Sequence, residues 1–317
     1  TQIVSVDYNA LNIDVDIDEK INSKQKNYFK INTTNQNGNP EKADGNIKIY
    51  QLKMPDRVFR DRKWENPDVF SMSKEDFYKN FPLDVYKNEN EVIQWEKGRE
   101  VLSFNFATPQ DTFLVLKDLK KWQQGVYLME IKSKDIYGTA LEVKKYFTVY
   151  SPDEKQIPLN EVAWMQMIKS AGEPGETASF LFGSKEKDLS VLYETEVDGQ
   201  ITSKQWLKVT DEQKLFEIPI TEAHRGNFNI HLTFVKNNRS YSFNETVIVP
   251  FTNKKLDISF ESFRNKLLPG QKEEWKIRIR GSKGEKLAAE MLASMYDASL
   301  DAFLVKDWHF NIYDINY

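Results

Sequence analysis

The chain has no cysteine and only three histidines, His224, His231 and His309. Without cysteine there can be no thiol nucleophile, disulfide framework, Cys-ligated zinc site or iron–sulfur cluster. A Ser nucleophile needs a base beside it, and none of the histidines stands in a recognisable nucleophile context such as Gly-x-Ser-x-Gly. The sequence therefore predicts a protein that is not an enzyme, with no catalytic, cofactor-binding or metal-binding residue and no cofactor.

Excess positive charge and long apolar runs are also missing. The 317 residues carry 44 Lys and Arg against 48 Asp and Glu, for a net charge of −4, so a phosphate backbone would meet no general attraction. Mean hydropathy is −0.62, and no apolar run is long enough to cross a membrane. Residues 1–6 lack the basic and apolar regions of a signal peptide. We expect a soluble chain with no nucleic-acid partner and no membrane span in this segment.

Alternating apolar and polar residues recur along most of the chain, and a period of two indicates strands with one buried face. These segments are rich in the aromatic and β-branched residues that pack well on a pleated surface. The clearest expected strands are residues 47–49, 101–106, 126–131, 146–150, 180–182, 228–234, 241–249 and 275–279. Turn residues such as Asp198-Gly199 and Asn237-Asn238 separate them. The sequence predicts an all-β fold of consecutive antiparallel β-sandwiches.

The alternation fades between about residues 54 and 95. Within this stretch Ser73-Lys-Glu-Asp76 is a capping box, and Phe77 and Phe81 follow four residues apart. We therefore expect a short helix at about 74–81, inside an insertion in the first sandwich. The insertion also contains aromatic residues that we interpret as packing it onto the sandwich rather than as a binding lid: Trp64, Phe70, Tyr86 and Trp95.

At roughly 100–200 residues per domain, the length predicts two or three domains. A polar, proline-marked stretch at residues 151–158 indicates one boundary, and the residues that follow 249–251 indicate another. We expect a first sandwich at 1–153 with its insertion at about 54–95, a second at 154–254, and the first part of a third at 255–317. The last segment is too short for a complete sandwich of about 100 residues.

Several local patterns look like functional motifs without their full spacing. The glycines of Gly172-Glu-Pro-Gly175 and Gly281-Ser-Lys-Gly284 lack the spacing of phosphate-binding loops, so we interpret both as turns. Residues 14–19, Asp-Val-Asp-Ile-Asp-Glu, begin like a calcium loop, but Glu19 stands where Gly is needed and Gln25 where Glu is needed. A strand with a solvated acidic face is the better interpretation. His231 alternates with apolar neighbours and should point to solvent.

Tryptophan is the strongest compositional argument for a binding site. Seven tryptophans and 14 tyrosines could form a sugar-stacking platform. Burial of five of the tryptophans would exclude the platform, and two or three coplanar, exposed rings among them would support it: Trp64, Trp95, Trp122, Trp164 and Trp206. Trp275 alternates in phase with Ile277 and Ile279 and is predicted to lie in a core. Paired carboxylates for glycoside cleavage stay open, because only their spatial separation is diagnostic.

Several stretches resemble the bacterial branch of the alpha-2-macroglobulin family. The longest runs from Val249-Pro-Phe-Thr to Phe263 and continues at 265–279. Residues 287–300 resemble the family's alternating strand that ends in an Asp-x-Ser-Leu-like turn, and segments at 38–50 and 122–138 resemble hairpins of macroglobulin-type domains. The resemblance implies consecutive macroglobulin-type sandwiches, which are immunoglobulin- or fibronectin-like.

Propensity and resemblance disagree over residues 285–302. Ala, Leu, Met and Glu crowd this stretch and favour a helix, whereas the family implies a strand through about Tyr296. We expect the strand, because alternate residues from Leu287 to Met295 are also apolar. In relatives a bait region is inserted soon after this strand, so we expect the chain to stop about where that insertion would begin.

The resemblance implies a part in a protease trap, in which a protease cuts an exposed bait and is then enclosed or covalently caught. The Cys-x-Glu-Gln thioester of many relatives is not in this chain and lies far downstream in the family. The implied partners are target proteases, through the parent protein, and other macroglobulin-type domains of the same chain. The resemblance also implies that the protein is exported to the periplasm or the cell surface. The alternative is a carbohydrate- or protein-binding β-sandwich module of an outer-membrane assembly.

Overall fold

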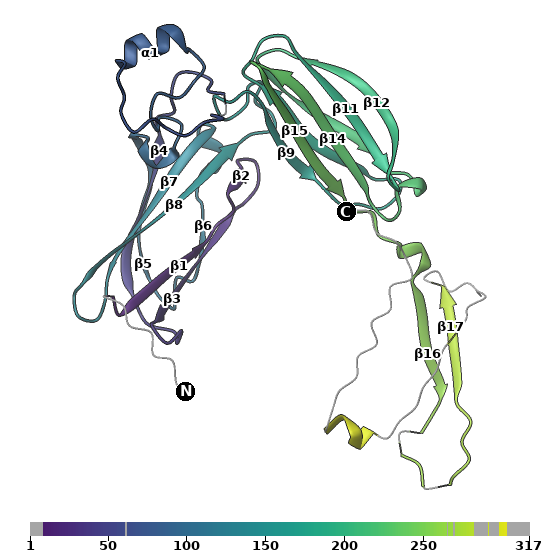
Figure 1. Cartoon of the computed structure of the whole chain (residues 1–317). Helices are drawn as coiled ribbons and strands as arrows, with labels where there is room; N and C mark the ends of the chain where they lie inside the picture. The colour runs from purple at the N-terminus through teal and green to yellow at the C-terminus, as the bar shows by residue number, and fades with distance from the viewer. Residues whose placement is uncertain are drawn as a thin grey trace.

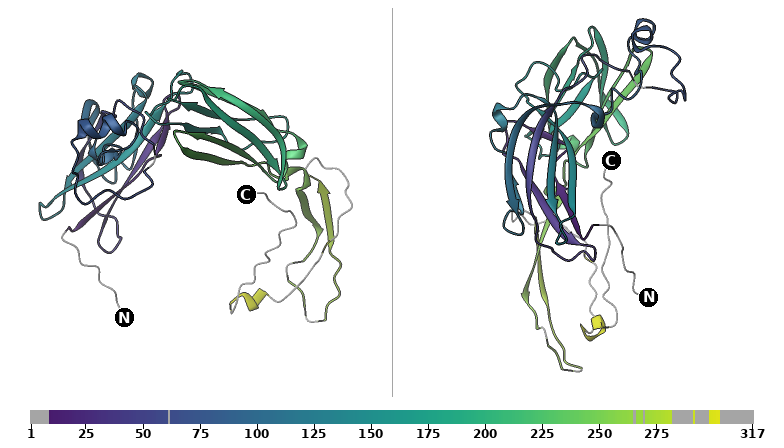
Figure 2. Two further views of the ribbon diagram at one scale, coloured as in Figure 1. Left: turned by 45° about the horizontal axis from the view of Figure 1, so that its top comes forward. Right: turned by 90° about the vertical axis from the view of Figure 1, so that its left-hand side faces the viewer.

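The computed structural model describes residues 9–60, 62–264, 266–268, 270–281, 291 and 298–302. Two β-sandwiches meet near one end and diverge, and a separate two-stranded sheet follows the second sandwich (Figure 1). From other directions the described chain forms an arch (Figure 2). None of the helices within the described residues has the length and apolar character needed to span a lipid bilayer.

The first sandwich packs a three-stranded sheet, in the order β1-β3-β6, against a five-stranded sheet, in the order β2-β8-β7-β4-β5. Inward residues of both sheets form its core, where Ile47 and Ile49 are completely buried and the rings of Tyr127 and Phe147 stack with their centroids 5.8 Å apart. The strands are β1 (Leu11–Asp16), β2 (Lys20–Asn22), β3 (Tyr28–Asn35), β4 (Asp44–Leu52), β5 (Lys97–Ala107), β6 (Phe113–Val115), β7 (Gly125–Lys134) and β8 (Ala140–Tyr150).

The insertion lies between β4 and β5, as predicted, and contains the helix α1 (Lys74–Asn80). The Oγ of Ser73 accepts a hydrogen bond from the backbone N–H of Asp76 at 3.1 Å, which confirms the predicted helix start. The rings of Phe77 and Phe81 lie 5.3 Å apart. No residue of α1 is fully buried, so capping and contacts within the insertion, such as that between Phe77 and Tyr86, hold this helix.

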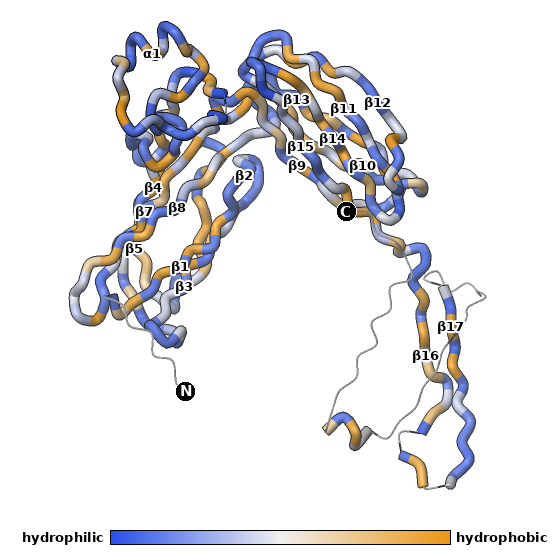
Figure 3. The backbone as a smooth tube through the Cα atoms, viewed as in Figure 1, coloured by the Kyte–Doolittle hydropathy of each residue, from blue (hydrophilic) through white to orange (hydrophobic). Residues whose placement is uncertain are grey.

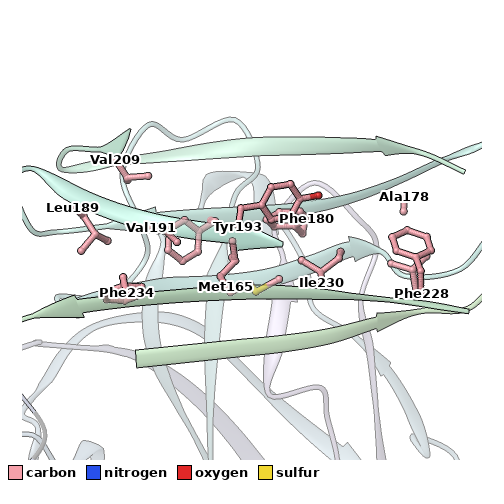
Figure 4. Close-up of a cluster of buried hydrophobic side chains, with 14 of the residues drawn as sticks. Met165, Ala178, Phe180, Leu189, Val191, Tyr193, Val209, Phe228, Ile230 and Phe234 are labelled. Atoms are coloured by element: carbon pink, nitrogen blue, oxygen red, sulfur yellow. The ribbon is translucent and has the colours of Figure 1, made fainter. Parts of the chain in front are cut away.

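The second sandwich packs the three-stranded sheet β13-β10-β9 against the four-stranded sheet β12-β11-β14-β15. Phe180, Phe228 and Ile230 are completely buried between the sheets (Figure 4). The expected alternation is visible as apolar and polar residues taking turns along the strands (Figure 3). The strands are β9 (Trp164–Lys169), β10 (Thr177–Ser184), β11 (Leu189–Val197), β12 (Gln200–Val209), β13 (Glu212–Pro219), β14 (Phe228–Lys236) and β15 (Arg239–Val247).

The hairpin turns of this sandwich follow the predicted turn chemistry. Asp198 and Gly199 have φ of 49° and 71°, and Asn237 and Asn238 have φ of 51° and 58°. These left-handed values suit Gly, Asn and Asp and match the twist of the flanking strands. The predicted strands and the all-β fold with a helical insertion are confirmed, with strand ends displaced by a few residues.

The third segment begins with the two-stranded sheet of β16 (Leu256–Ser262) and β17 (Lys276–Gly281). The prediction that Trp275 lies in a core is wrong, because its side chain is 39% exposed and touches Phe260 and Phe263 by ring edges. Within the described residues this sheet has no second layer over its faces. The Gly281-Ser-Lys-Gly284 turn, the strand expected at 287–296 and His309 fall outside the described residues, apart from Gly281 and Met291.

Candidate functional site

His231 lies on the outer face of the second sandwich, as predicted. Its Nδ1 is 2.7 Å from Asn244 Oδ1, and its Nε2 is 2.8 Å from Glu196 Oε2. The three residues belong to three neighbouring strands, β14, β15 and β11. The half-buried imidazole therefore links strands, which agrees with a structural role.

His224 ends a short 3₁₀ helix (Glu222–His224) that leads into β14. Its Nδ1 accepts a hydrogen bond from the backbone N–H of Thr221 at 3.2 Å, and its ring lies 4.4 Å from that of Phe228. Burial lowers the pKa of His224 below its ordinary value. The neutral imidazole is thus an acceptor in a cap and part of the apolar packing.

The acidic segment at residues 14–19 lies on and just after strand β1. Asp14 and Asp16 are exposed on β1, on either side of the buried Val15, so this strand has the predicted acidic face. Among the residues described by the structure, no group of three or more His, Asp or Glu side chains is placed to hold a metal ion.

The tryptophans do not form a common platform. Trp122 and Trp164 are buried, Trp95 is half-buried, and Trp64 and Trp206 are 55% and 68% exposed. Trp64 lies beside β15, with the guanidinium of Arg239 6.0 Å from its ring centroid, whereas Trp206 lies on β12. Strands β15 and β12 are opposite edges of the same sheet, so the two exposed rings do not lie side by side as one stacking platform.

The junction between the two sandwiches is the most elaborate site of the described chain. The connector after β8 contains no strand, but its Ile157 is buried with Tyr150, Trp164 and Leu181. From the other side, Lys20 of β2 donates to the carbonyl oxygen of Met165 at 3.4 Å and lies 4.6 Å from the Trp164 ring centroid. The connector is therefore a packed joint rather than a free linker.

The insertion adds a second set of contacts at this junction. Its Trp95 packs against Leu52, Val126 and Leu128 of the first sandwich, as predicted for one of the four aromatic residues. Phe70 and Tyr86 instead contact each other within the insertion, with ring centroids 5.0 Å apart. The insertion is thus anchored on the first sandwich at the end of its returning leg.

A buried ion pair joins the two legs of the insertion. Arg60 donates from Nε to Asp84 Oδ1 at 2.5 Å and from Nη2 to Oδ2 at 2.8 Å. Asp84 is only 5% exposed. The hydrogen bonds from Arg60 hold the pKa of Asp84 below its usual range and raise the pKa of Arg60. Arg62 reinforces the joint by donating to the carbonyl oxygen of Val85.

The first leg then reaches the second sandwich. Val58 packs against the core of that sandwich, and Arg60 Nη1 donates to the carbonyl oxygen of Asn237 at 3.3 Å. In return, Asn160 of the connector donates to the carbonyl oxygen of Pro55 at 2.8 Å. These contacts join segments that are as many as 177 residues apart in the sequence, and sequence patterns did not point to them.

Two adjoining cavities, of about 330 and 400 Å³, lie where these segments meet. Both are lined by Trp95, Leu159 and Phe243, so the insertion, the connector and the second sandwich contribute to both cavities. The second cavity is also lined by residues of the first sandwich, among them Val126 and Tyr146.

Comparison with known families gives one match. Residues 164–302 match the family model described as the alpha-2-macroglobulin bait region domain. The matched range begins with the first residue of β9 and ends with the last residue of the 3₁₀ helix Ala298–Ala302, so it includes the second sandwich and the β16–β17 sheet. A comparison with curated proteins finds no match.

Three solved structures align with most of the chain. For native E. coli alpha-2-macroglobulin the TM-score is 0.29 and the identity 12%, covering 84% of this chain and 16% of that chain. For a mutant Salmonella alpha-2-macroglobulin the TM-score is 0.29 and the identity 9%, and the alignment covers 88% of this chain and 19% of that chain. For a bacterial ice-binding adhesin, in a structure concerned with host cell surface retention, the TM-score is 0.22 and the identity 7%. This alignment covers 78% of this chain and 68% of that chain.

At these identities and TM-scores, we infer neither the fold nor the function of the chain from the solved structures. The chain also spans only 16% and 19% of the two alpha-2-macroglobulins, so the activity of a whole protein does not transfer to it directly. The family match is independent of these alignments. Residues 164–302 of the chain are thus similar to the bait region domain of the alpha-2-macroglobulin family.

Proposed function

We propose that the chain is a structural segment of a bacterial alpha-2-macroglobulin-like, broad-spectrum protease inhibitor of the cell envelope. The observation that carries this proposal is the match of residues 164–302 to the bait region domain. The segment acts as scaffold and hinge for a protease trap, and not as an enzyme. The structural roles of His224 and His231 support this reading.

A trap of this kind needs rigid bodies and movable joints. One cut in a bait releases a bistable assembly, which then relaxes around the attacker. Close-packed sandwich cores do not deform gradually, so the movement must occur where bodies meet. The junction described above, with its connector and insertion, is such a place in this chain.

We propose two macroglobulin-type units, at 1–153 and 154–254, and the first part of a third at 255–317. Separate hydrophobic cores support the division of the first two, and a strandless connector lies between them. The family match extends across residue 254, so the second and third units would act together in presenting the bait. The partners would be target proteases, through the complete protein, and its other macroglobulin-type domains, in the periplasm or at the cell surface.

The proposal is tested by protease activity on substrates of two sizes. The complete protein that contains this chain is mixed with trypsin, and activity is measured on a small chromogenic peptide and on casein. A trap predicts loss of activity on casein with activity on the peptide retained. Unchanged activity on both substrates would contradict inhibition and leave a binding or structural protein. Complete protein already cut by another protease is the control.

A further inference from the structure

We propose that residues 54–95, called the brace below, fix the angle between the first and second sandwiches, with Arg60 as the central positioning residue. The brace leaves the first sandwich after β4 and returns at β5. Its two legs are joined by the Arg60–Asp84 pair and by Arg62. Because both ends are anchored on one sandwich while its first leg contacts the other, it can restrain their relative movement.

Arg60 has the geometry for this role. Two of its nitrogens bind Asp84 and a third donates to Asn237 at 3.3 Å. A guanidinium is a planar fork with fixed donor directions, so the bidentate bond to a buried carboxylate determines where the third donor points. The first leg, the second leg and the β14–β15 turn thereby meet at one side chain.

The β14–β15 turn is itself tied to the body of the second sandwich. Asn237 donates from Nδ2 to Glu186 Oε1 at 2.8 Å, and Lys236 donates from Nζ to the carbonyl oxygen of Lys187 at 2.6 Å. Glu186 and Lys187 lie between β10 and β11. A restraint on this turn therefore acts on both sheets of the sandwich and not on a loose loop.

The brace and the connector hold the junction at different places. The connector and Lys20 act at the first residues of β9, whereas the brace acts at the β14–β15 turn and through Val58 on the core. One attachment alone would leave a hinge, and relative motion is the default for domains with a small interface. Two separate attachments remove most of that freedom.

The test measures the distance between the sandwiches with and without the brace contacts. The chain has no cysteine, so Lys144→Cys on β8 and Lys208→Cys on β12 introduce two unique spin-label sites for pulsed electron paramagnetic resonance. In Arg60→Gln the third donor and the bidentate bond are lost. We expect the distance distribution to broaden and its maximum to move. Lys53→Gln, which breaks the exposed Lys53–Glu96 pair that flanks the same insertion, should leave the distribution unchanged.

A second pair of variants keeps the test decisive if Arg60→Gln does not fold. Val58→Ala weakens the apolar contact with the second sandwich, and Val69→Ala, at a position 77% exposed, is its matched control. Circular dichroism shows which variants retain their strands. An unchanged distribution in the folded Val58→Ala variant, or in a folded Arg60→Gln variant, overturns the proposal. The measurement uses no protease, so its result is independent of the proposed inhibitor function.

Discussion

Asp84 lies between Leu83 and Val85 in a segment without regular secondary structure, yet it is one of the buried carboxylates of the chain. Its partner Arg60 is 24 residues away, and neither residue stands in a motif. Burial of a charge is tolerated when a partner with good geometry is present. The burial and pairing of Asp84 therefore depend on tertiary contacts, which a sequence pattern does not reveal.

Removal of the Asp84 charge should destabilise the protein at neutral pH. The folded pKa of Asp84 is lowered, so the stabilisation is present above the unfolded value of about 3.9 and is lost as the pH falls through the folded pKa. We expect Asp84→Asn to lower the free energy of unfolding by about 3 kcal/mol at pH 7.

Urea unfolding at two pH values checks this prediction. The difference between wild type and Asp84→Asn should shrink as the pH falls below the unfolded pKa of about 3.9, because the ionised form of Asp84 then stabilises the folded protein less. Asp68→Asn, at an exposed position of the insertion, is the control and should change little. A difference of the same size at both pH values would show that the charge is not responsible.

His224 should make stability depend on pH in the mildly acidic range. Its folded pKa is lowered by burial, so protons bind more readily to the unfolded chain once the pH falls below about 6.5. Thermal unfolding midpoints should therefore decline between pH 7.5 and 5.5. We expect a smaller decline in His224→Asn, which keeps an acceptor for Thr221. Equal declines in both proteins would rule out this role of His224.

At the scale of elements, local signals predicted most of the fold. The strands followed from period-two alternation and the turns from Asn, Asp and Gly at positive φ, because both signals act between near neighbours. Trp275 shows where this reasoning ends. Its alternation with Ile277 and Ile279 indicated a buried face, but burial also needs a second layer, and the described residues place none over β16 and β17.

The candidate site was much less predictable than the fold. Trp95 was expected to pack on the first sandwich and does so. The contacts of Val58 and Arg60 with the second sandwich depend on how two folded bodies meet, which alternation and turn chemistry do not encode. The polar connector at 151–158 was recognised as a boundary, but the burial of Ile157 within it was not.

Helix α1 offers a prediction at this scale. Ser73→Ala removes the acceptor for Asp76 N–H, which costs about 1 kcal/mol for an N-cap. Because α1 buries no residue, this loss should melt the helix without unfolding the sandwiches. Amide hydrogen exchange of residues 74–80 should become faster, while β-strand amides stay protected. Ser71→Ala, also exposed, is the control, and unchanged exchange in Ser73→Ala would contradict local capping.

At the scale of the whole molecule, the two sandwiches are joined by one packed connector and one brace. The bait region match begins at the first residue of β9, directly after the connector. A rearrangement that starts in the matched region must therefore pass through this junction to reach the first sandwich.

The most direct test of a trap scaffold is the position of the first proteolytic cut in the complete protein. Brief exposure to several proteases of different specificity, followed by mass spectrometry, maps that cut. The account predicts one dominant early cut on the C-terminal side of β17 for each protease, with both sandwiches intact. Slow cuts scattered through residues 9–264, with no dominant early site, would contradict it.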